Sequence, residues 1–182
     1  MNTVASSMAE YKLQNVRPTF RQNGRSTMIK KLRRRATCIV EQINSEGELS
    51  ILIAEQKKSK YYLLPGGRAE KEETSAQAAI RELREETHLK TTGLIYLFEH
   101  HSTHHCHKVF YIHSTYPKLK AKDDVKALHY LPLTELDRLQ TPDESNITLF
   151  KHLSHSTKDI LCLYRDWRKK NHELLRLLSQ IS

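Results

Sequence analysis

Three glutamates near the middle of the chain, Glu82, Glu85 and Glu86, have the spacing of residues on one side of a helix. At about 100° per residue, Glu85 lies roughly 60° to one side of Glu82 and Glu86 roughly 40° to the other. Carboxylates this close raise one another's pKa values unless a multivalent cation offsets the charge. The spacing fits a site for a hard cation, Mg²⁺ or Mn²⁺, and equally a solvated acidic helix face.

The residues around these glutamates predict the helix that would carry them. Thr74 and Gln77 match a capping box, which places the first helical residue near Ser75. The next apolar residues recur at i, i+3, i+4 and i+7, the spacing of one buried face: Ala76, Ala79, Ile80 and Leu83. We therefore expect a helix over residues 75–87 that packs against a sheet.

The whole segment 67–89 resembles the Nudix box. That motif is a Gly, five residues, a Glu, seven residues, Arg-Glu, an apolar residue, any residue, Glu-Glu, any residue, a Gly and an apolar residue. Eight of its nine specified positions match, at Gly67, Glu73, Arg81, Glu82, Leu83, Glu85, Glu86 and Leu89. His88 stands where the family has Gly. Because that Gly commonly closes a helix in a left-handed conformation, we expect a small stability cost and no loss of chemistry.

The resemblance implies roles for the matching residues. Glu82, Glu85 and Glu86 would bind the metal, Gly67 would add its backbone carbonyl, and Glu85 or Glu86 would also orient or deprotonate the attacking water. Glu73 would pair with Arg81 and hold the loop against the helix, as structural support of the site.

The implied activity is Mg²⁺-dependent (or Mn²⁺-dependent) hydrolysis of a pyrophosphate bond in a nucleoside diphosphate-linked or nucleoside triphosphate substrate. Two alternatives stay open. One is a non-catalytic Nudix-like nucleotide-binding or regulatory domain, against which the three intact glutamates speak. The other is an enzyme for a more anionic substrate, such as a dinucleoside polyphosphate, an inositol pyrophosphate or RNA with a 5′-triphosphate.

Further candidate site residues lie outside the box. Asp123 and Asp124 precede a predicted strand and are either an additional catalytic acid or turn residues in a Lys-rich loop. Candidate phosphate-binding residues are Arg35, His104, His105 and Lys108. Five histidines fall within residues 100–107, a density that suits either a soft-metal site or, as the spacing favours, a polar loop beside a strand that begins at Lys108.

The order of elements predicts an α+β fold, and the resemblance implies a Nudix-type α/β/α sandwich with a mixed sheet and a C-terminal helical extension. We expect strands at 35–42, 49–54, 60–64, 93–98, 108–113 and 127–131, a short helix at 133–139, and two helical patterns from about residue 147, the last over 158–181. Residues 1–29 are predicted to form a basic, flexible extension, 30–142 the Nudix domain, and 143–182 helices that pack on or extend that domain.

The net charge and composition of the chain limit the classes of molecule that it is expected to bind. The net charge is +9, and residues 1–35 hold nine Lys or Arg against one acid, Glu10. This favours a phosphorylated small molecule, by the motif a nucleotide; RNA is less favoured because the basic run 30–35 has no interleaved aromatic residues. The Leu-rich segment 174–181 packs on the domain or forms a homodimer seam.

Three separated cysteines, Cys38, Cys106 and Cys162, do not suggest a disulfide framework, and no apolar run has the length of a membrane span. We therefore expect a cytoplasmic protein, with an organelle transit sequence as the alternative reading of the Arg-rich start.

Overall fold

The computed structural model describes residues 32–44, 46–91, 93–114, 119–136 and 148–179. The predicted extension at 1–29 lies outside these residues. The elements in chain order are β1 (Arg33–Ile43), β2 (Leu49–Gln56), β3 (Tyr62–Leu63), α2 (Ser75–Thr87), β4 (Ile95–His101), β5 (His105–His113), β6 (Val125–Pro132), α3 (Leu133–Leu136), α4 (Thr148–Lys151), α5 (His155–Lys170) and α6 (His172–Ser179). No helix in the described ranges is long and apolar enough to cross a membrane.

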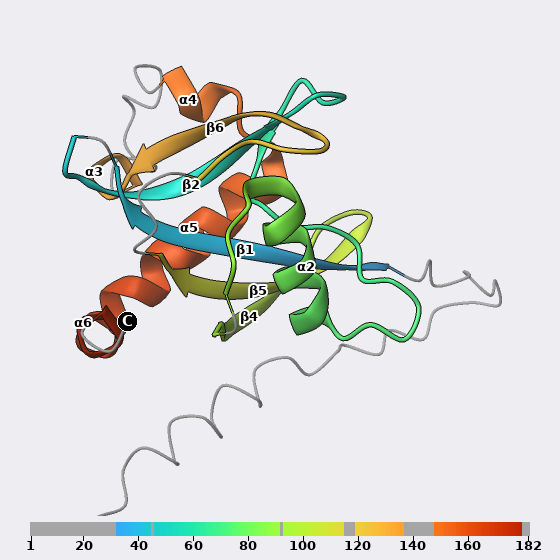
Figure 1. Cartoon of the computed structure of the whole chain (residues 1–182). Helices are drawn as coiled ribbons and strands as arrows, with labels where there is room; N and C mark the ends of the chain where they lie inside the picture. The colour runs from blue at the N-terminus through green and yellow to red at the C-terminus, as the bar shows by residue number, and fades with distance from the viewer. Residues whose placement is uncertain (1–31, 45, 92, 115–118, 137–147, 180–182) are drawn as a thin grey trace, which may run out of the picture. The chain divides into compact units, whose positions relative to one another are not determined.

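A mixed sheet forms the middle of the fold (Figure 1). Its strand order is β3-β2-β1-β5-β4, with β6 paired to β2; β1 and β5 run parallel and the other pairs run antiparallel. β2 pairs with β1 only opposite Glu41–Ile43 and then diverges from it. The N-terminal half of β1 therefore has an edge that β2 does not occupy.

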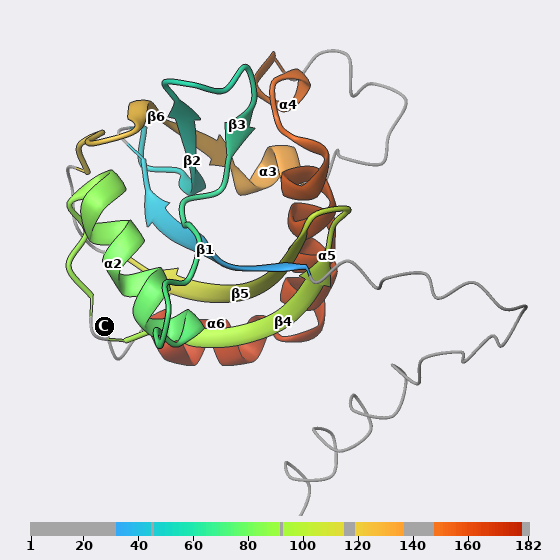
Figure 2. The same ribbon diagram turned by 90° about the vertical axis from the view of Figure 1, so that its right-hand side faces the viewer.

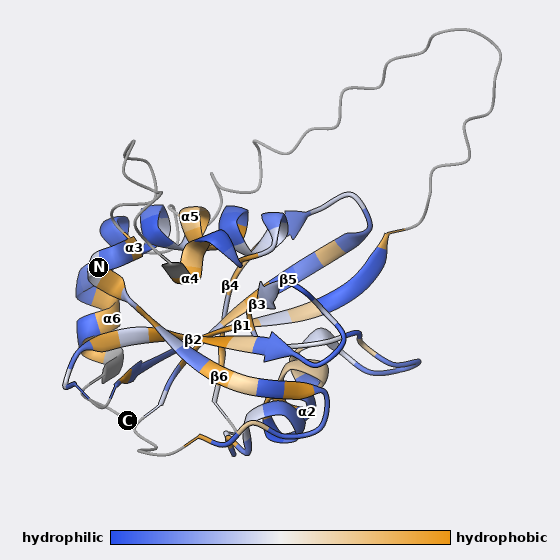
Figure 3. Cartoon of the chain, turned by 90° about the horizontal axis from the view of Figure 1, so that it is seen from above, coloured by the Kyte–Doolittle hydropathy of each residue, from blue (hydrophilic) through white to orange (hydrophobic). Residues whose placement is uncertain are grey.

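Helices cover both faces of this sheet, with α2 on one side and α5 on the other (Figure 2). In β1, Ala36, Cys38 and Val40 belong to the core beneath α2, whereas Ile39 belongs to the core beneath α5. Both faces of β1 are thus buried, and apolar residues concentrate along the central strands (Figure 3). The α+β prediction of an α/β/α sandwich with a mixed sheet is confirmed.

The helix that carries the glutamates, α2, begins and ends as predicted. The Thr74 hydroxyl accepts from Gln77 N at 3.2 Å, and Gln77 Oε1 accepts from Thr74 N at 2.9 Å. The buried face is rotated slightly from the predicted one: Ala78 and Glu86 are buried, whereas Ala76 and Ile80 are only half-buried. The rotation turns Glu86 toward the inside of the domain.

Two predicted boundaries were wrong. Residues 100–107 are not mainly a loop, because β4 runs to His101 and β5 starts at His105, pairing His100 with His107 and His101 with Cys106. The predicted helix 158–181 is two helices, α5 and α6. Asn171 ends α5: its side-chain amide donates to Trp167 O at 2.8 Å, and its backbone carbonyl accepts from Leu175 N in α6.

His88 occupies the left-handed cap of α2, with φ 60° and ψ 6°, and its N–H donates to Arg84 O. We expect His88→Gly to stabilise the protein by about 1 kcal/mol, because Gly adopts this conformation without a Cβ clash. The midpoint of thermal unfolding should rise by about 2–4 °C. Lys90→Gly, an exposed position without a positive φ, is the control and should give no gain. If the unfolding midpoint of His88→Gly is lower than that of wild type, the left-handed backbone conformation of His88 is not strained.

A buried carboxylate links the sheet to α5. Glu41 is 2% exposed and accepts from Tyr164 Oη at 2.6 Å, Tyr111 Oη at 3.1 Å and Arg168 Nε at 2.9 Å. A buried charge is tolerated only when it is paired and hydrogen-bonded. β1, β5 and α5 are therefore tied together at Glu41.

Removal of Arg168 should destabilise the fold, because the buried carboxylate of Glu41 would lose the guanidinium that pairs with it. We expect Arg168→Met to lower the free energy of unfolding by about 1–3 kcal/mol in urea titrations. Lys170→Met removes an exposed charge at the end of the same helix and should change stability little. Adding Glu41→Gln to Arg168→Met should recover part of the loss, and a further loss would show that the charge is not the cause.

Candidate active site

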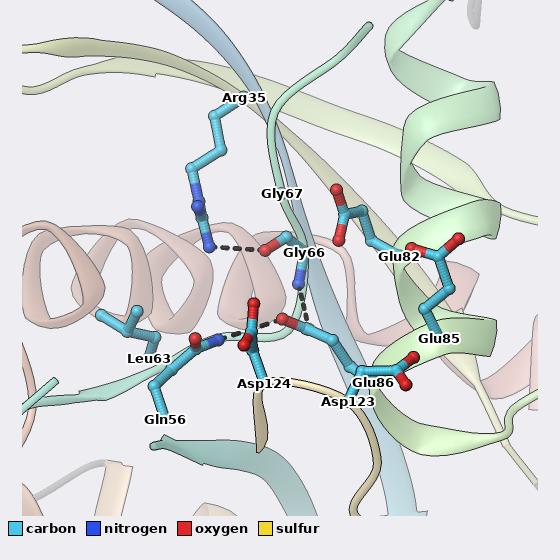
Figure 4. A pocket seen from close by; sticks show the side chains of 10 residues that line it. All are labelled: Arg35, Gln56, Leu63, Gly66, Gly67, Glu82, Glu85, Glu86, Asp123 and Asp124. Carbon is cyan, nitrogen blue, oxygen red and sulfur yellow. Dashed lines mark hydrogen bonds between the residues drawn. The ribbon is translucent and has the colours of Figure 1, made fainter. Parts of the chain in front are cut away.

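Three glutamates of α2 face a cleft formed with the loop after β3 and the loop before β6 (Figure 4). Glu82, Glu85 and Glu86 differ in exposure: the Glu85 side chain is 41% exposed, that of Glu82 17%, and Glu86 as a residue only 6%. The helix thus directs three carboxylates into the same cleft: that of Glu85 is the most exposed to solvent, that of Glu82 is less exposed, and that of Glu86 is buried.

Gly66 fixes the buried carboxylate. Its N–H donates to Glu86 Oε2 at 2.9 Å, while Gln56 Nε2 donates to Glu86 Oε1 at 3.0 Å. Gly66 has φ +130°, and a Cβ there would collide with the backbone carbonyl of Ala36. Only Gly can bring the backbone this close to β1 while it turns its N–H toward the helix.

Gly67 continues the same loop along the vacant edge of β1. Its carbonyl accepts from Ala36 N at 2.9 Å, and the Pro65 carbonyl accepts from Cys38 N at 2.8 Å. A Cβ at Gly67 would collide with the carboxylate of Glu82. The carbonyl of Gly67 keeps one lone pair for a cation, and the carbonyl of Gly66 accepts from Arg35 Nη2 inside the cleft.

Arg81 organises the outer side of the cluster. It makes two hydrogen bonds to Glu73, at 2.9 and 3.0 Å, so the contact predicted for this pair is present. Its Nη1 also donates to Glu82 at 3.0 Å and to Glu85 at 3.1 Å. The guanidinium lowers the pKa of Glu73, and the pKa of Arg81 is itself raised, chiefly by the hydrogen bonds to Glu73.

Burial changes the acidity of the inner carboxylates. Desolvation raises the pKa of Glu86 to about 7, against the opposing hydrogen bond from Gly66 and the charge of Arg35. The pKa of Glu82 is also raised, again mainly by desolvation and despite the neighbouring Arg81. Arg35 and Arg81 therefore do not fully compensate the charge of this cluster.

The loop before β6 brings two more acids to the cleft. Lys120 N donates to Thr87 O and Lys122 N donates to Glu86 O, which ties this loop to the last turn of α2. Asp123 and Asp124 follow and line the cleft, with Asp123 at φ 50°. Both interpretations of Asp123 and Asp124 from the sequence fit the structure: the two residues lie in a turn, and they line the same cleft as the glutamates.

The other predicted residues do not share one location. Arg35 lines the cleft, whereas His104, His105 and Lys108 are not among its lining residues. His105 and Lys108 point to opposite faces of the sheet, because they are three positions apart in β5. The sequence analysis missed Gln56, Leu63 and Gly66, which line the cleft but lie outside the motif. No signal in a single sequence distinguishes Gln56 and Leu63 from ordinary strand ends, whereas Gly66 directly precedes the first residue of the motif.

The oxygen atoms of the cleft suit a hard divalent cation. Carboxylates line it together with the backbone of Gly66 and Gly67, whereas none of its described lining residues is a cysteine or a histidine. Mg²⁺ and Mn²⁺ prefer oxygen ligands of this kind. A cation would also offset the unfavourable burial of charge at Glu82 and Glu86. The residues present therefore fit such an ion.

Comparisons with known proteins agree with this geometry. The family model of the NUDIX domain matches residues 32–153. The chain belongs to the Nudix family. It is an enzyme of the Nudix pyrophosphohydrolase type. No curated protein sequence matches the chain significantly.

Solved Nudix structures share the fold. A protein from Chromobacterium violaceum assigned to the Nudix hydrolase family is 27% identical, covers 83% of this chain and 90% of its own, and has a TM-score of 0.64. The NUDIX domain of Shewanella oneidensis NrtR, complexed with ADP-ribose, is 16% identical, with 91% and 98% covered and a TM-score of 0.58. A bifunctional NMN adenylyltransferase/ADP-ribose pyrophosphatase from Francisella tularensis, complexed with AMP and a manganese ion, is 23% identical, with 77% and 43% covered and a TM-score of 0.53.

The raised pKa of Glu86 predicts how the stability of this Nudix domain depends on pH. The folded protein binds a proton at Glu86 more tightly than the unfolded chain, whose Glu pKa is near 4.5. In metal-depleted protein, this contribution to stability is present below about pH 4.5 and is lost as pH rises through about 7. Glu86→Gln should reduce this pH dependence by roughly 2–3 kcal/mol between pH 5 and 8.

The measurement is thermal unfolding of metal-depleted wild type and Glu86→Gln across this pH range. Added Mg²⁺ or Mn²⁺ should raise the wild-type midpoint more at pH 8 than at pH 5, because the cation competes with the proton. Glu46→Gln, an exposed position in the β1–β2 turn, is the control and should follow wild type. Parallel curves for wild type and Glu86→Gln would argue against a buried charge at this position.

Proposed function

We propose that this Nudix enzyme hydrolyses the pyrophosphate bond of a nucleoside diphosphate-linked or nucleoside triphosphate substrate, with Mg²⁺ or Mn²⁺ as cofactor. One observation carries the proposal: the glutamates of α2, two aspartates of the loop before β6 and Arg35 line a single cleft with Gly66 and Gly67. These two glycines belong to the loop after β3, which we call the Gly-rich loop. The family comparison gives the reaction class, and this cleft is where we place the reaction.

The geometry supports different roles for Glu85 and Glu86. Both oxygens of Glu86 accept hydrogen bonds, from Gly66 and Gln56, so this side chain is held in one position. Glu85 is more exposed, and among the described residues it accepts from Arg81 alone. We therefore assign Glu86, together with Glu82 and the Gly67 carbonyl, to cation binding. Glu85 also binds the cation and is the group that accepts the proton of the attacking water.

A bound divalent cation would supply charge neutralisation at the phosphoryl oxygens and would acidify water. The chain's own residues provide the remaining functions. Arg35 lies at the cleft with its guanidinium next to the Gly66 carbonyl, where it can bind a phosphate oxygen of the substrate. Asp123 and Asp124 line the cleft from the loop that is hydrogen-bonded to the last turn of α2, and they are candidates for an additional acid.

Two structural neighbours support a nucleotide as substrate, since one is complexed with ADP-ribose and another with AMP and manganese. Both are under 25% identical to this chain, so they support the class of substrate and not its identity. The net charge of +9 is consistent with an anionic substrate.

The first test is turnover of the full chain on a panel of ADP-ribose, other nucleoside diphosphate derivatives, nucleoside triphosphates and dinucleoside polyphosphates. We expect Mg²⁺- or Mn²⁺-dependent release of a nucleotide or phosphate product and none after chelation. Glu85→Gln should lower kcat by about 10²–10⁴-fold, because the general base is lost while the fold is kept. Glu46→Gln provides the matched control and should retain wild-type turnover.

The same panel can overturn the proposal. Absence of metal-dependent turnover on every substrate, in protein that binds nucleotides, would favour the non-catalytic alternative. An unchanged kcat in Glu85→Gln, with activity lost in Glu86→Gln, would move the base from Glu85 to Glu86.

A further inference from the structure

The β4–β5 hairpin places three metal-binding side chains on one face. His101 of β4 pairs directly with Cys106 of β5, and Glu99 precedes His101 by two residues, so all three lie on the same side of the pleat. One carboxylate oxygen, one imidazole nitrogen and the thiol sulfur lie within 4.8 Å of one another. His101 Nε2 and Glu99 Oε1 are in hydrogen-bond contact.

The other histidines of the hairpin point elsewhere. His100 pairs with His107, and the two rings lie 5.9 Å apart. His107 Nδ1 is 3.0 Å from the hydroxyl of Thr37, and the ring of His105 packs edge-on against that of His107. The strand histidines are therefore divided between the two faces, with His100, His105 and His107 on one face and His101 on the other, next to the cysteine and the carboxylate.

We propose that Glu99, His101 and Cys106 form a second metal site, for a soft divalent cation with Zn²⁺ as the first candidate. Thiolate, imidazole and carboxylate are the three ligand types that Zn²⁺ accepts, at about 2.3, 2.0 and 2.0–2.2 Å. The three ligand atoms already lie within 4.8 Å of one another, close to the separations that a single tetrahedral ion requires. Three protein ligands leave the fourth tetrahedral position to water.

The charge at this place suits a dication. The side chain of Cys106 is hydrogen-bonded to Glu99, and without a metal the neutral thiol donates to that carboxylate. When Zn²⁺ binds, the S–H proton leaves to solvent and a Zn–S bond forms. The thiolate and the carboxylate then carry two negative charges against the two positive charges of the ion. Lys108, paired across the strands with Glu99, remains outside the ligand set.

This site differs from the catalytic cleft in chemistry and in place. The cleft is lined by carboxylates, which favour Mg²⁺ or Mn²⁺, and none of Glu99, His101 and Cys106 lines it. Soft ligands select Zn²⁺ over Mg²⁺. An ion at the hairpin would connect β4 to β5 near their turn and so stabilise one edge of the sheet.

The test uses Co²⁺ as a spectroscopic substitute for Zn²⁺ in metal-depleted, reduced full-length chain. We expect a thiolate-to-cobalt charge-transfer band in the near ultraviolet, intense visible bands of tetrahedral Co²⁺, and loss of both bands on addition of Zn²⁺. Ions bound by the all-oxygen cleft give no thiolate band, so the two sites are distinguished in one spectrum.

Cys106→Ser should abolish the charge-transfer band, and His101→Gln should weaken Zn²⁺ binding at least about tenfold. Cys162→Ser, which alters another partly buried cysteine, is the matched control and should keep the band. Circular dichroism checks the fold of each variant. If Cys106→Ser does not fold, the Zn²⁺ affinity of His101→Gln tests the proposal instead. Absence of the band in wild type, or its persistence in folded Cys106→Ser, would overturn the proposal.

Discussion

The close approach of the Gly-rich loop to β1 is the contact on which the candidate active site depends. β2 leaves the edge of β1 early, and Pro65 and Gly67 accept the N–H groups of Cys38 and Ala36 in its place. Buried backbone donors must be satisfied, so the loop acts as a short substitute strand. The same loop turns the N–H of Gly66 toward Glu86, which places the carboxylates against a fixed backbone.

Charge burial at α2 is the cost of this arrangement. Glu86 is nearly inaccessible, with its pKa raised by desolvation, and Glu82 is affected in the same direction. Isolated buried carboxylates are unfavourable, and the fold supplies only partial compensation through Gly66, Gln56, Arg35 and Arg81. The uncompensated negative charge destabilises this cluster when no cation is bound, and a divalent cation would offset that charge. Catalytic sites commonly hold titratable groups in perturbed states of this kind.

A second buried carboxylate, that of Glu41, differs from Glu86 because it is paired with a cationic side chain. Glu41 lies on the α5 side of β1 and is fully paired, with two tyrosine hydroxyls and the guanidinium of Arg168. Its contacts are structural, because its partners come from β5 and α5 and the residue is almost completely buried. Glu41 thus supports the fold through a paired charge, whereas among the described residues Glu86 is hydrogen-bonded only by neutral donors and is the residue for which we propose cation binding.

The sequence by itself determined the local features. The capping box, the apolar period and the fixed spacings of 67–89 predicted α2, its end at His88 and the three carboxylates, because each depends on residues within a few positions of one another. The tertiary structure decided what is joined across the chain. Gln56, Arg35 and Asp123 reach the cleft from three different segments, and strand register alone brings Cys106 opposite His101. A one-residue shift in register would turn that pair to the other face, and a single sequence does not specify the register.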